Sequence, residues 1–282
     1  MHCMANNQPL DRYAVFGNPV GHSLSPKIHA LFAAQTGQAM QYESICAPLD
    51  GFAKAVHAFR AAGGQGANVT VPFKVEAHAL SDELTLRAQA AGAVNTLAFS
   101  ATGILGDNTD GAGLVRDITH NLGVSLAGKR ILVLGAGGAA RGVILPLKEA
   151  APADIMIANR TAETALALAS SFGVHGGGFE VIQACAFDIV INATSAGLTD
   201  AVLPAPTFTP GALAYEMVYG RETQFMQAAR AAGAGLRVAD GLGMLVEQAA
   251  EAFFVWRGVR PQTLSVLAGL RQAVQGSGKD GA

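Results

Sequence analysis

Two serines, Ser23 and Ser25, stand directly before Pro26, and proline is common in the first turn of a helix. Ser25 is therefore expected to cap this helix, whereas Ser23 has no such structural duty. Hydroxyl groups beside a helix N-terminus suit an anion, because free N–H groups and the helix dipole both attract negative charge. The pair predicts a binding site for the carboxylate of a small acid.

A lysine follows an apolar segment in "GANVTVPFK", residues 66–74. Val69, Val71 and Phe73 alternate with polar residues or proline, which is the period of a strand with one buried face. Pro72 cannot donate to a strand ladder, so the strand 67–71 is expected to end there. Lys74 would then lie where a strand opens into a loop, which is where α/β proteins bind ligands. A lone lysine at this position is usually just solvated, so other residues must indicate the same site.

Two further polar residues occur in apolar surroundings. Asn95 lies inside the predicted strand 93–99, and Asp110 lies in "GDNTDGAG", residues 106–113, which is expected to be a turn and hinge between two domains. Buried polar groups need partners, and a polar substrate can be one. Taken singly, each of these residues is more often structural than functional.

A glycine-rich segment follows the predicted strand 131–134 and opens a helix. Its pattern is G-x-G-x-x-A, formed by Gly135, Ala136, Gly137, Gly138, Ala139 and Ala140. Gly135 allows a tight turn, and Gly137 lets the backbone approach a pyrophosphate that rests on the helix N-terminus. A strand before the glycines and a helix after them form the context that a dinucleotide site requires.

The next predicted strand ends in Asn159-Arg160-Thr161. An NAD site normally has an acidic residue here, which binds the ribose 2′-hydroxyl. A carboxylate would repel a 2′-phosphate, whereas arginine can pair with it through charge-assisted hydrogen bonds. The sequence therefore predicts NADP as the cofactor, although Thr161 could also simply cap a helix beside an exposed Arg160.

The elements that position these residues indicate an α/β protein. Predicted strands at 13–17, 67–71 and 93–99 alternate with helical patterns, and a second such series starts at Lys129. We expect an N-terminal α/β substrate domain at 1–112 and a doubly wound, Rossmann-like NADP domain at 113–243. A C-terminal helix at about 244–256 could pack on either domain, and helices within about 244–275 are expected to pack back on the first.

Composition limits the classes of function. The 282 residues are 50% hydrophobic and 14% charged, with a net charge of −2, which favours a compact protein and provides no basic surface for nucleic acid or an anionic membrane. The three cysteines are widely spaced and form no disulfide or metal motif. No signal-peptide pattern or membrane-length apolar segment is present. A cytoplasmic protein without a metal site is expected.

Together the segments resemble the shikimate dehydrogenase family over nearly the whole chain. The resemblance rests on "FGNPVGHSLSPKIH", "GANVTVPFK", "AGAVNT", "GDNTDG", "GAGGAARG", "NRT", "INATSAG" and "ADGLGMLVEQAA", which occur in family order. It implies reversible reduction of 3-dehydroshikimate to shikimate by NADPH in aromatic amino-acid biosynthesis.

The resemblance also implies roles for individual residues. Lys74 matches the catalytic lysine and Asp110 its partner, so that Lys74 would give a proton as hydride reaches the carbonyl carbon. The matched substrate-binding residues are Ser23, Ser25, Thr70, Asn95, Tyr219 and Gln248. The matched cofactor-binding residues are Gly135, Ala136, Gly137, Gly138, Ala139, Asn159, Arg160, Thr161, Thr194, Met217 and Gly241.

Two positions depart from the family pattern. Thr164 stands where many members have a second basic residue, so a 2′-phosphate would rest mainly on Arg160. Glu216 stands where aspartate is usual, a change expected to affect only packing. The first departure bears on cofactor selectivity.

Other functions stay open. A paralogue that also oxidises quinate, with NAD as an alternative cofactor, would need only a pocket that admits one more hydroxyl. A non-catalytic NADP-binding sensor would keep the glycine loop but would not need Lys74 and Asp110. Methylenetetrahydrofolate dehydrogenases share the cofactor fold but lack the "SLS" and "NVTVPFK" combination. The expected partner is a small-molecule substrate, with the chain a monomer or homodimer.

Overall fold

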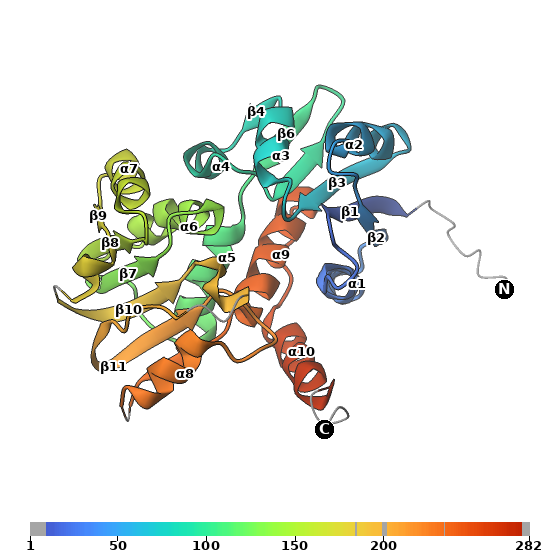
Figure 1. Ribbon diagram of the computed structural model, residues 1–282. Helices are drawn as coiled ribbons and strands as arrows, with labels where there is room; N and C mark the ends of the chain where they lie inside the picture. The colour runs from blue at the N-terminus through green and yellow to red at the C-terminus, as the bar shows by residue number, and fades with distance from the viewer. Residues whose placement is uncertain (1–9, 184, 199–201, 234, 278–282) are drawn as a thin grey trace. The chain divides into compact units, whose positions relative to one another are not determined.

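The computed structural model describes residues 10–183, 185–198, 202–233 and 235–277. It contains two compact units, each with its own sheet (Figure 1). Of the residues described, the first unit comprises 10–89, Ala93–Thr109 and Ala249–Val266. The second comprises the described residues of Ala90–Gly92, Asp110–Gln248 and 267–277. The predicted α/β class is confirmed.

The first unit is built on a mixed six-stranded sheet in the order β2-β1-β3-β5-β6-β4. Strands β1, β2 and β3 are parallel, whereas β5 runs antiparallel to both β3 and β6. The strands are β1 (Asp11–Gly17), β2 (Met40–Cys46), β3 (Gly64–Val69), β4 (Glu83–Leu84), β5 (Thr96–Phe99) and β6 (Ile104–Asp107). The helices are α1 (Ser25–Thr36), α2 (Phe52–Ala61), α3 (Lys74–Leu80) and α4 (Leu86–Ala91), of which Ala90 and Ala91 belong to the second unit.

An aromatic core supports the turn that carries the predicted catalytic lysine. Phe73 is 2% exposed and stacks on Phe52 of α2, with 4.8 Å between ring centroids. Phe16 of β1 packs edge-on against the same Phe52 ring. Stacked and edge-on aromatic pairs stabilise a core beyond the area they bury. The residue immediately before Lys74 is thus anchored in the core of this unit.

The second unit has an entirely parallel six-stranded sheet in the order β12-β11-β10-β7-β8-β9. Its strands are β7 (Arg130–Leu134), β8 (Asp154–Ala158), β9 (His175–Gly177), β10 (Ala186–Asn192), β11 (Thr207–Glu216) and β12 (Arg237–Ala239). Its helices include α5 (Asp110–Arg116), α6 (Gly138–Glu149), α7 (Ala162–Phe172), α8 (Gln224–Ala231) and α10 (Leu264–Ser277), of which Leu264–Val266 belong to the first unit. Helix α9 (Leu242–Arg257) has residues in both units.

Helices cover both faces of this second sheet (Figure 1). Ile131 and Val133 of β7 belong to one core cluster with residues of α6 and α7, and Leu132 and Leu134 belong to another that includes residues of α8. A strand buried on both faces is apolar at successive positions rather than at alternate ones. The sheet is doubly wound: β7, β8 and β9 follow one another in one direction across the sheet, and β10, β11 and β12 in the other. The strand order therefore reverses between β7 and β10, where such sheets bind ligands.

Two predicted strand boundaries are wrong. Strand β3 ends at Val69 rather than 71, because Val71 is 63% exposed and the cis Val71–Pro72 bond belongs to a turn. The predicted strand 93–99 begins only at Thr96. The predicted junction 106–113 contains the end of β6 and the start of α5, and the two units divide within it, between Thr109 and Asp110.

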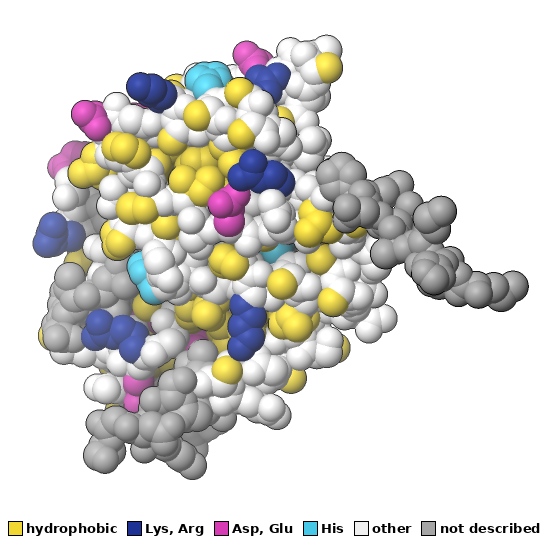
Figure 2. Space-filling model, turned by 90° about the vertical axis from the view of Figure 1, so that its right-hand side faces the viewer, with side chains coloured by type: hydrophobic (Ala, Val, Ile, Leu, Met, Phe, Trp, Pro, Cys, Tyr) yellow, Lys and Arg dark blue, Asp and Glu magenta, His cyan; other side chains and the backbone are white. Residues whose placement is uncertain are grey.

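The predicted helix near 244–256 is confirmed as α9. Among the described helices, none combines the length and apolar character that crossing a membrane requires. On the face shown in Figure 2, Lys and Arg side chains lie among acidic and hydrophobic ones and do not gather into one basic patch.

Candidate functional site

Lys74 is the first residue of helix α3 and not the end of a strand. Its carbonyl oxygen accepts a 2.8 Å hydrogen bond from the N–H of Val94, and the turn before it is closed by a bond from Phe73 N–H to Thr70 C=O. The N–H of Thr70 donates a 2.9 Å hydrogen bond to Phe16 C=O, which fixes Thr70 to strand β1. The backbone of Lys74 is therefore fixed beside the segment that leads to Asn95.

Asn95 is 3% exposed and lies just before β5. Its side-chain oxygen accepts the backbone N–H of Thr109 over 2.9 Å, and its amide group donates to the Thr109 hydroxyl over 3.0 Å. A side-chain amide bound at both ends is held in one orientation. Lys74, Thr70 and Asn95 thus lie on neighbouring, hydrogen-bonded segments of the first unit.

Asn68 is a buried member of this network that the sequence analysis missed. Its amide donates to the Asn95 carbonyl and to the Thr96 hydroxyl, both over 3.1 Å, and its oxygen accepts the Tyr42 hydroxyl over 2.7 Å. Asn68 alternates with Val69 along β3, and this polar position within a strand was the sequence feature that could have indicated it. Asn68 joins strand β2 to the segment that carries Asn95.

Ser25 is 7% exposed, and its N–H donates to the Ser23 hydroxyl over 3.2 Å. The predicted cap at Ser25 is wrong by one residue, because Leu24 occupies the N-cap and Ser25 begins α1. Burial raises the pKa of Tyr42 well above its ordinary value, and a hydrogen bond with Ser25 opposes that shift. Tyr42 therefore connects the serine segment with Asn68.

Asp107 holds the first part of the segment 106–113 in place through hydrogen bonds. The carboxylate is 2% exposed and is bound at both oxygens by the Arg87 guanidinium, over 2.7 and 2.6 Å. It also accepts the N–H of Asn108 and the hydroxyl of Thr85. Burial alone would raise the pKa of Asp107, but these donors together lower it. Residues 107–109 are rigidly held because the buried carboxylate is fully satisfied.

His29 of α1 is buried within an aromatic cluster of the first unit. Its ring stacks on Tyr42 with 4.3 Å between centroids, and Trp256 and Phe253 lie at 5.3 and 6.2 Å. Neither imidazole nitrogen has a hydrogen-bond partner among the described residues. Burial lowers the pKa of His29 to about 3, and the nearby Asn68 side chain only partly offsets this. The imidazole is neutral at physiological pH.

The glycine loop of the second unit has the backbone shape that a pyrophosphate requires. Gly135 has a φ of +102°, a conformation that suits glycine, and its N–H donates to Ala158 C=O. Gly137 caps α6, and a Cβ built at Gly137 or Gly138 would meet no protein atom within 4 Å. The N-terminus of α6 is thus open to an anion, so these residues fit the diphosphate of a dinucleotide.

Asn159, Arg160 and Thr161 follow β8, the strand beside β7. The Asn159 amide donates to Thr161 C=O over 3.0 Å, and Arg160 is exposed. Thr161 occupies the N-cap of α7 but makes no side-chain capping bond. The alternative that Thr161 serves only as a helix cap is therefore weakened, because its hydroxyl makes no capping hydrogen bond to the backbone of α7.

Thr194 follows β10, where its N–H and hydroxyl both donate to the side-chain oxygen of Asn192, over 3.1 and 2.7 Å. Met217 follows β11 and is packed closely by Gly241, since a Cβ at Gly241 would lie 2.1 Å from Met217 C=O. Thr194, Met217 and the glycine loop all follow the carboxyl ends of adjacent parallel strands, the edge at which doubly wound sheets bind dinucleotides.

Three predicted substrate or catalytic residues belong to the second unit. Asp110 begins α5 and is 9% exposed, and Gln248 of α9 is buried to the same extent. A Cβ at Gly113 would lie 2.6 Å from the Gln248 backbone nitrogen, so α5 and α9 approach closely there. Burial raises the pKa of Tyr219. The structure therefore places Lys74 in one unit and these three residues in the other.

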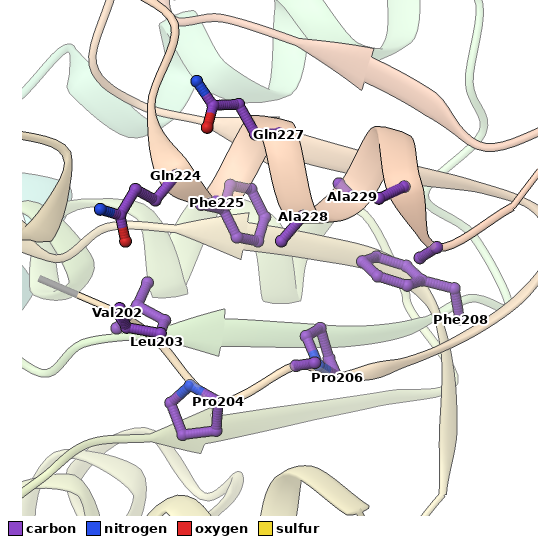
Figure 3. Close-up of a pocket in the computed structure, with 13 residues that line it drawn as sticks. Val202, Leu203, Pro204, Pro206, Phe208, Gln224, Phe225, Gln227, Ala228 and Ala229 are labelled. Atoms are coloured by element: carbon purple, nitrogen blue, oxygen red, sulfur yellow. The ribbon is translucent and has the colours of Figure 1, made fainter. Parts of the chain in front are cut away.

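A separate groove of about 430 Å³ lies between helix α8 and residues 202–208 (Figure 3). Its lining is mainly apolar and includes Phe208, Phe225 and Pro206, and no predicted site residue belongs to it. Within the described ranges, no group of three or more His, Cys, Asp or Glu side chains could hold a metal ion.

Comparison with known proteins relates this geometry to one family. Residues 15–97 match the shikimate dehydrogenase substrate binding domain, 117–202 match shikimate / quinate 5-dehydrogenase, and 241–268 match the shikimate 5′-dehydrogenase C-terminal domain. The chain belongs to the shikimate dehydrogenase family. A relative named shikimate dehydrogenase (NADP(+)), from Dechloromonas aromatica, is 61% identical over 93% of this chain and 97% of its own.

Solved structures share the fold. Shikimate 5-dehydrogenase from Thermus thermophilus, in complex with NADP(H) and shikimate, has a TM-score of 0.83 and 37% identity, covering 94% of this chain and 99% of that one. An Ael1 enzyme from Pseudomonas putida has a TM-score of 0.87 and 47% identity, covering 92% and 98%. The family predicted from the sequence motifs is thus confirmed.

Proposed function

We propose that this protein catalyses the reversible, NADPH-dependent reduction of 3-dehydroshikimate to shikimate, a step of aromatic amino-acid biosynthesis. Relatives at 55–61% identity are named shikimate dehydrogenase (NADP(+)), and a structural relative named shikimate 5-dehydrogenase is in complex with NADP(H) and shikimate. We further propose that residues 1–112 bind substrate and 113–243 bind NADP, in a cytoplasmic monomer or homodimer.

The observation that carries the proposal is the fixed position of Lys74 beside the Asn95 network. The Val94 N–H holds the Lys74 backbone, and Asn95 follows directly with its amide oriented by Thr109. A cation and an oriented amide suit a ligand with a carbonyl and neighbouring hydroxyls, because they supply a proton donor and a hydrogen-bonding group together.

The proposed chemistry assigns one role to each group. NADPH supplies the hydride when it is bound. Lys74 gives a proton to the carbonyl oxygen of the substrate as that oxygen becomes a hydroxyl, and in the reverse direction neutral Lys74 takes the hydroxyl proton. Asp110 would act as the partner of Lys74 at the reacting carbonyl or hydroxyl group, as the family resemblance implies.

The binding residues would orient the two reactants. Ser23 and Ser25 would hold the substrate carboxylate, with Thr70, Asn95, Tyr219 and Gln248 around its ring hydroxyls. On the cofactor side, the α6 N-terminus would hold the pyrophosphate and Arg160 the 2′-phosphate. Thr194, Met217 and Gly241 would border the rest of the cofactor.

A spectrophotometric assay of NADPH formation tests this function. The purified protein should reduce NADP when shikimate is added, with a much lower kcat/KM for quinate and for NAD. Quinate oxidation at a comparable rate would favour the alternative of a shikimate and quinate dehydrogenase, which the matched shikimate / quinate family description also allows. NADP binding without turnover of either acid would indicate a non-catalytic sensor.

A further inference from the structure

Glu216 is a fully buried carboxyl group at the end of β11, with 0% exposure. One of its oxygens accepts the Asn192 amide over 2.7 Å and the Thr223 hydroxyl over 2.9 Å. The other accepts the backbone N–H of Val218 over 3.0 Å. Three donors therefore converge on one buried acceptor group, an arrangement that a space-filling residue would not need.

Asn192, at the end of β10, connects Glu216 to a predicted cofactor residue. Its amide group donates to Glu216, while its side-chain oxygen accepts both the N–H and the hydroxyl of Thr194. The Thr194 hydroxyl also accepts the N–H of Ala196 over 3.1 Å. Rotating the Asn192 amide would turn its oxygen toward the Glu216 oxygens, so only one orientation satisfies every group.

Glu216 also orders the turn that follows its own strand. Its bond to Val218 N–H lies between Met217 and Tyr219 in sequence, and Met217 N–H donates to Asn192 C=O over 3.1 Å. Gly241 N–H then donates to Val218 C=O over 3.2 Å. The ends of β10 and β11, with Thr194 on one and Met217 and Tyr219 on the other, are thus joined through Glu216 and Asn192.

We propose that Glu216 is a positioning residue that acts through Asn192 to hold Thr194 and the turn 217–219 in place for NADP. This inference rests on the proposed function, because it concerns the same cofactor site. It revises the expectation that glutamate at this position affects only packing. Packing alone requires the volume of the side chain, whereas positioning requires an acceptor at both oxygens.

The variants Glu216→Gln and Glu216→Asp separate volume from acceptor chemistry. Glutamine keeps the volume but sets an NH2 group against the donors of Asn192 and Thr223 or of Val218. The dissociation constant of the Glu216→Gln variant for NADP, measured by calorimetry, should be about tenfold higher than that of the wild type or more, as expected for loss of a hydrogen bond to a charged group. Aspartate keeps two acceptor oxygens, so hydrogen bonding to the carboxylate is retained. The dissociation constant of the Glu216→Asp variant for NADP should therefore lie within about threefold of the wild-type value.

Asp117→Asn is the matched control. Asp117 is another buried carboxylate of the same unit, 1% exposed, and it accepts the hydroxyl of Tyr215, the neighbour of Glu216, over 2.6 Å. Its other oxygen accepts the Asn121 amide, and neither partner is a predicted cofactor residue. Its replacement should lower the melting temperature without changing NADP affinity. The inference is overturned if Glu216→Gln binds NADP as the wild type does, or if Asp117→Asn weakens binding equally.

A double-mutant cycle with Thr194→Val supplies a second test. If Glu216 acts through Thr194, the two losses of NADP affinity should be smaller in combination than their sum, because residues in one hydrogen-bond network are coupled. Additive losses would contradict the inference. Failure of the wild-type protein itself to bind NADP would instead contradict the proposed function, so the two failures are distinguishable.

Discussion

The N–H of Val94 donates a 2.8 Å hydrogen bond to the carbonyl oxygen of Lys74, which joins the start of helix α3 to the residue before Asn95. This bond uses backbone groups only, so it survives a change of either side chain. The position of residue 74 can therefore be separated experimentally from the chemistry of its ammonium group.

Lys74→Ala should lower kcat for shikimate oxidation by about 10²- to 10⁴-fold, the usual contribution of a proton-transfer group. The KM for shikimate should change much less, and the melting temperature should be retained. Lys54→Ala, which removes an exposed lysine of α2, is the control and should keep wild-type kinetics. If Lys74→Ala kept more than about a tenth of wild-type turnover, Lys74 would be only a binding residue.

Thr109→Val tests the orientation of Asn95. It removes the hydroxyl that bonds the Asn95 side chain, at nearly constant volume. Loss of a buried hydrogen bond costs about 1 kcal/mol, so the KM for shikimate should rise about fivefold. The KM for NADP should not change.

The control for Thr109→Val is Thr36→Val, which removes a hydroxyl bonded to Phe32 C=O in the same unit. It should affect stability alone. Equal increases in the shikimate KM from both variants would show that the effect of Thr109 is not specific to Asn95.

Arg160→Ala should weaken NADP and leave NAD nearly unchanged. A hydrogen bond to a charged group contributes about 1.5–3 kcal/mol, which corresponds to a preference for NADP of about 10- to 150-fold in the wild type. The two kcat/KM values should become similar in the variant. Arg230→Ala on α8 provides an exposed arginine as the control. A variant that still strongly preferred NADP would indicate that another cation, such as Arg141, binds the phosphate.

Gly241→Ala should disrupt the cofactor edge of the second sheet. The added Cβ would lie 2.1 Å from Met217 C=O, so the Met217 turn must move. Overpacking of this kind costs about 1–3 kcal/mol of stability, and NADP affinity should fall with it. Gly269→Ala in α10, where a Cβ meets nothing within 4 Å, should be neutral or stabilising by up to about 1 kcal/mol. Unchanged NADP affinity in Gly241→Ala would contradict the role given to this turn.

His29 should make stability fall with acidification. Its folded pKa of about 3 lies below the ordinary 6.5, so between these values the unfolded chain binds the additional proton. The free energy of unfolding should therefore fall by about 2 kcal/mol between pH 7 and pH 5 on account of this residue.

Urea unfolding of wild type and His29→Phe at both pH values measures the His29 contribution as a difference. His57→Gln, at an exposed position, should show the wild-type pH dependence. The same pH dependence in His29→Phe as in the wild type would contradict the assignment of a neutral buried imidazole.

The sequence predicted best those features that depend on neighbouring residues. The glycine loop is found where it was expected, because a φ of +102° at Gly135 suits a residue without a Cβ, and a strand and helix flank it. The family segments were recognisable for the same reason, since their order along the chain is a property of the sequence. Family, fold class and cofactor were all accessible in this way.

Features that depend on residues far apart in the chain were missed or misplaced. The two units divide within the segment 106–113, between Thr109 and Asp110, where the sequence predicted the junction. The sequence did not show that Asp107 in this segment is held by Arg87, twenty residues earlier. Asn68 looked like the polar side of a strand, but Tyr42 and Asn95 make it a buried connection.

What the sequence alone determined is therefore the local backbone chemistry, namely the glycine turn, the alternation of strands and helices, and the identity of the polar residues available. Only the tertiary structure decided which of those polar groups share a network, and Glu216 shows why. Its bond to Asn192 is made because the adjacent parallel strands β10 and β11 bring their carboxyl ends together. Its bond to Thr223 comes from the N-cap of α8, since a buried carboxyl group must find donors wherever the fold supplies them.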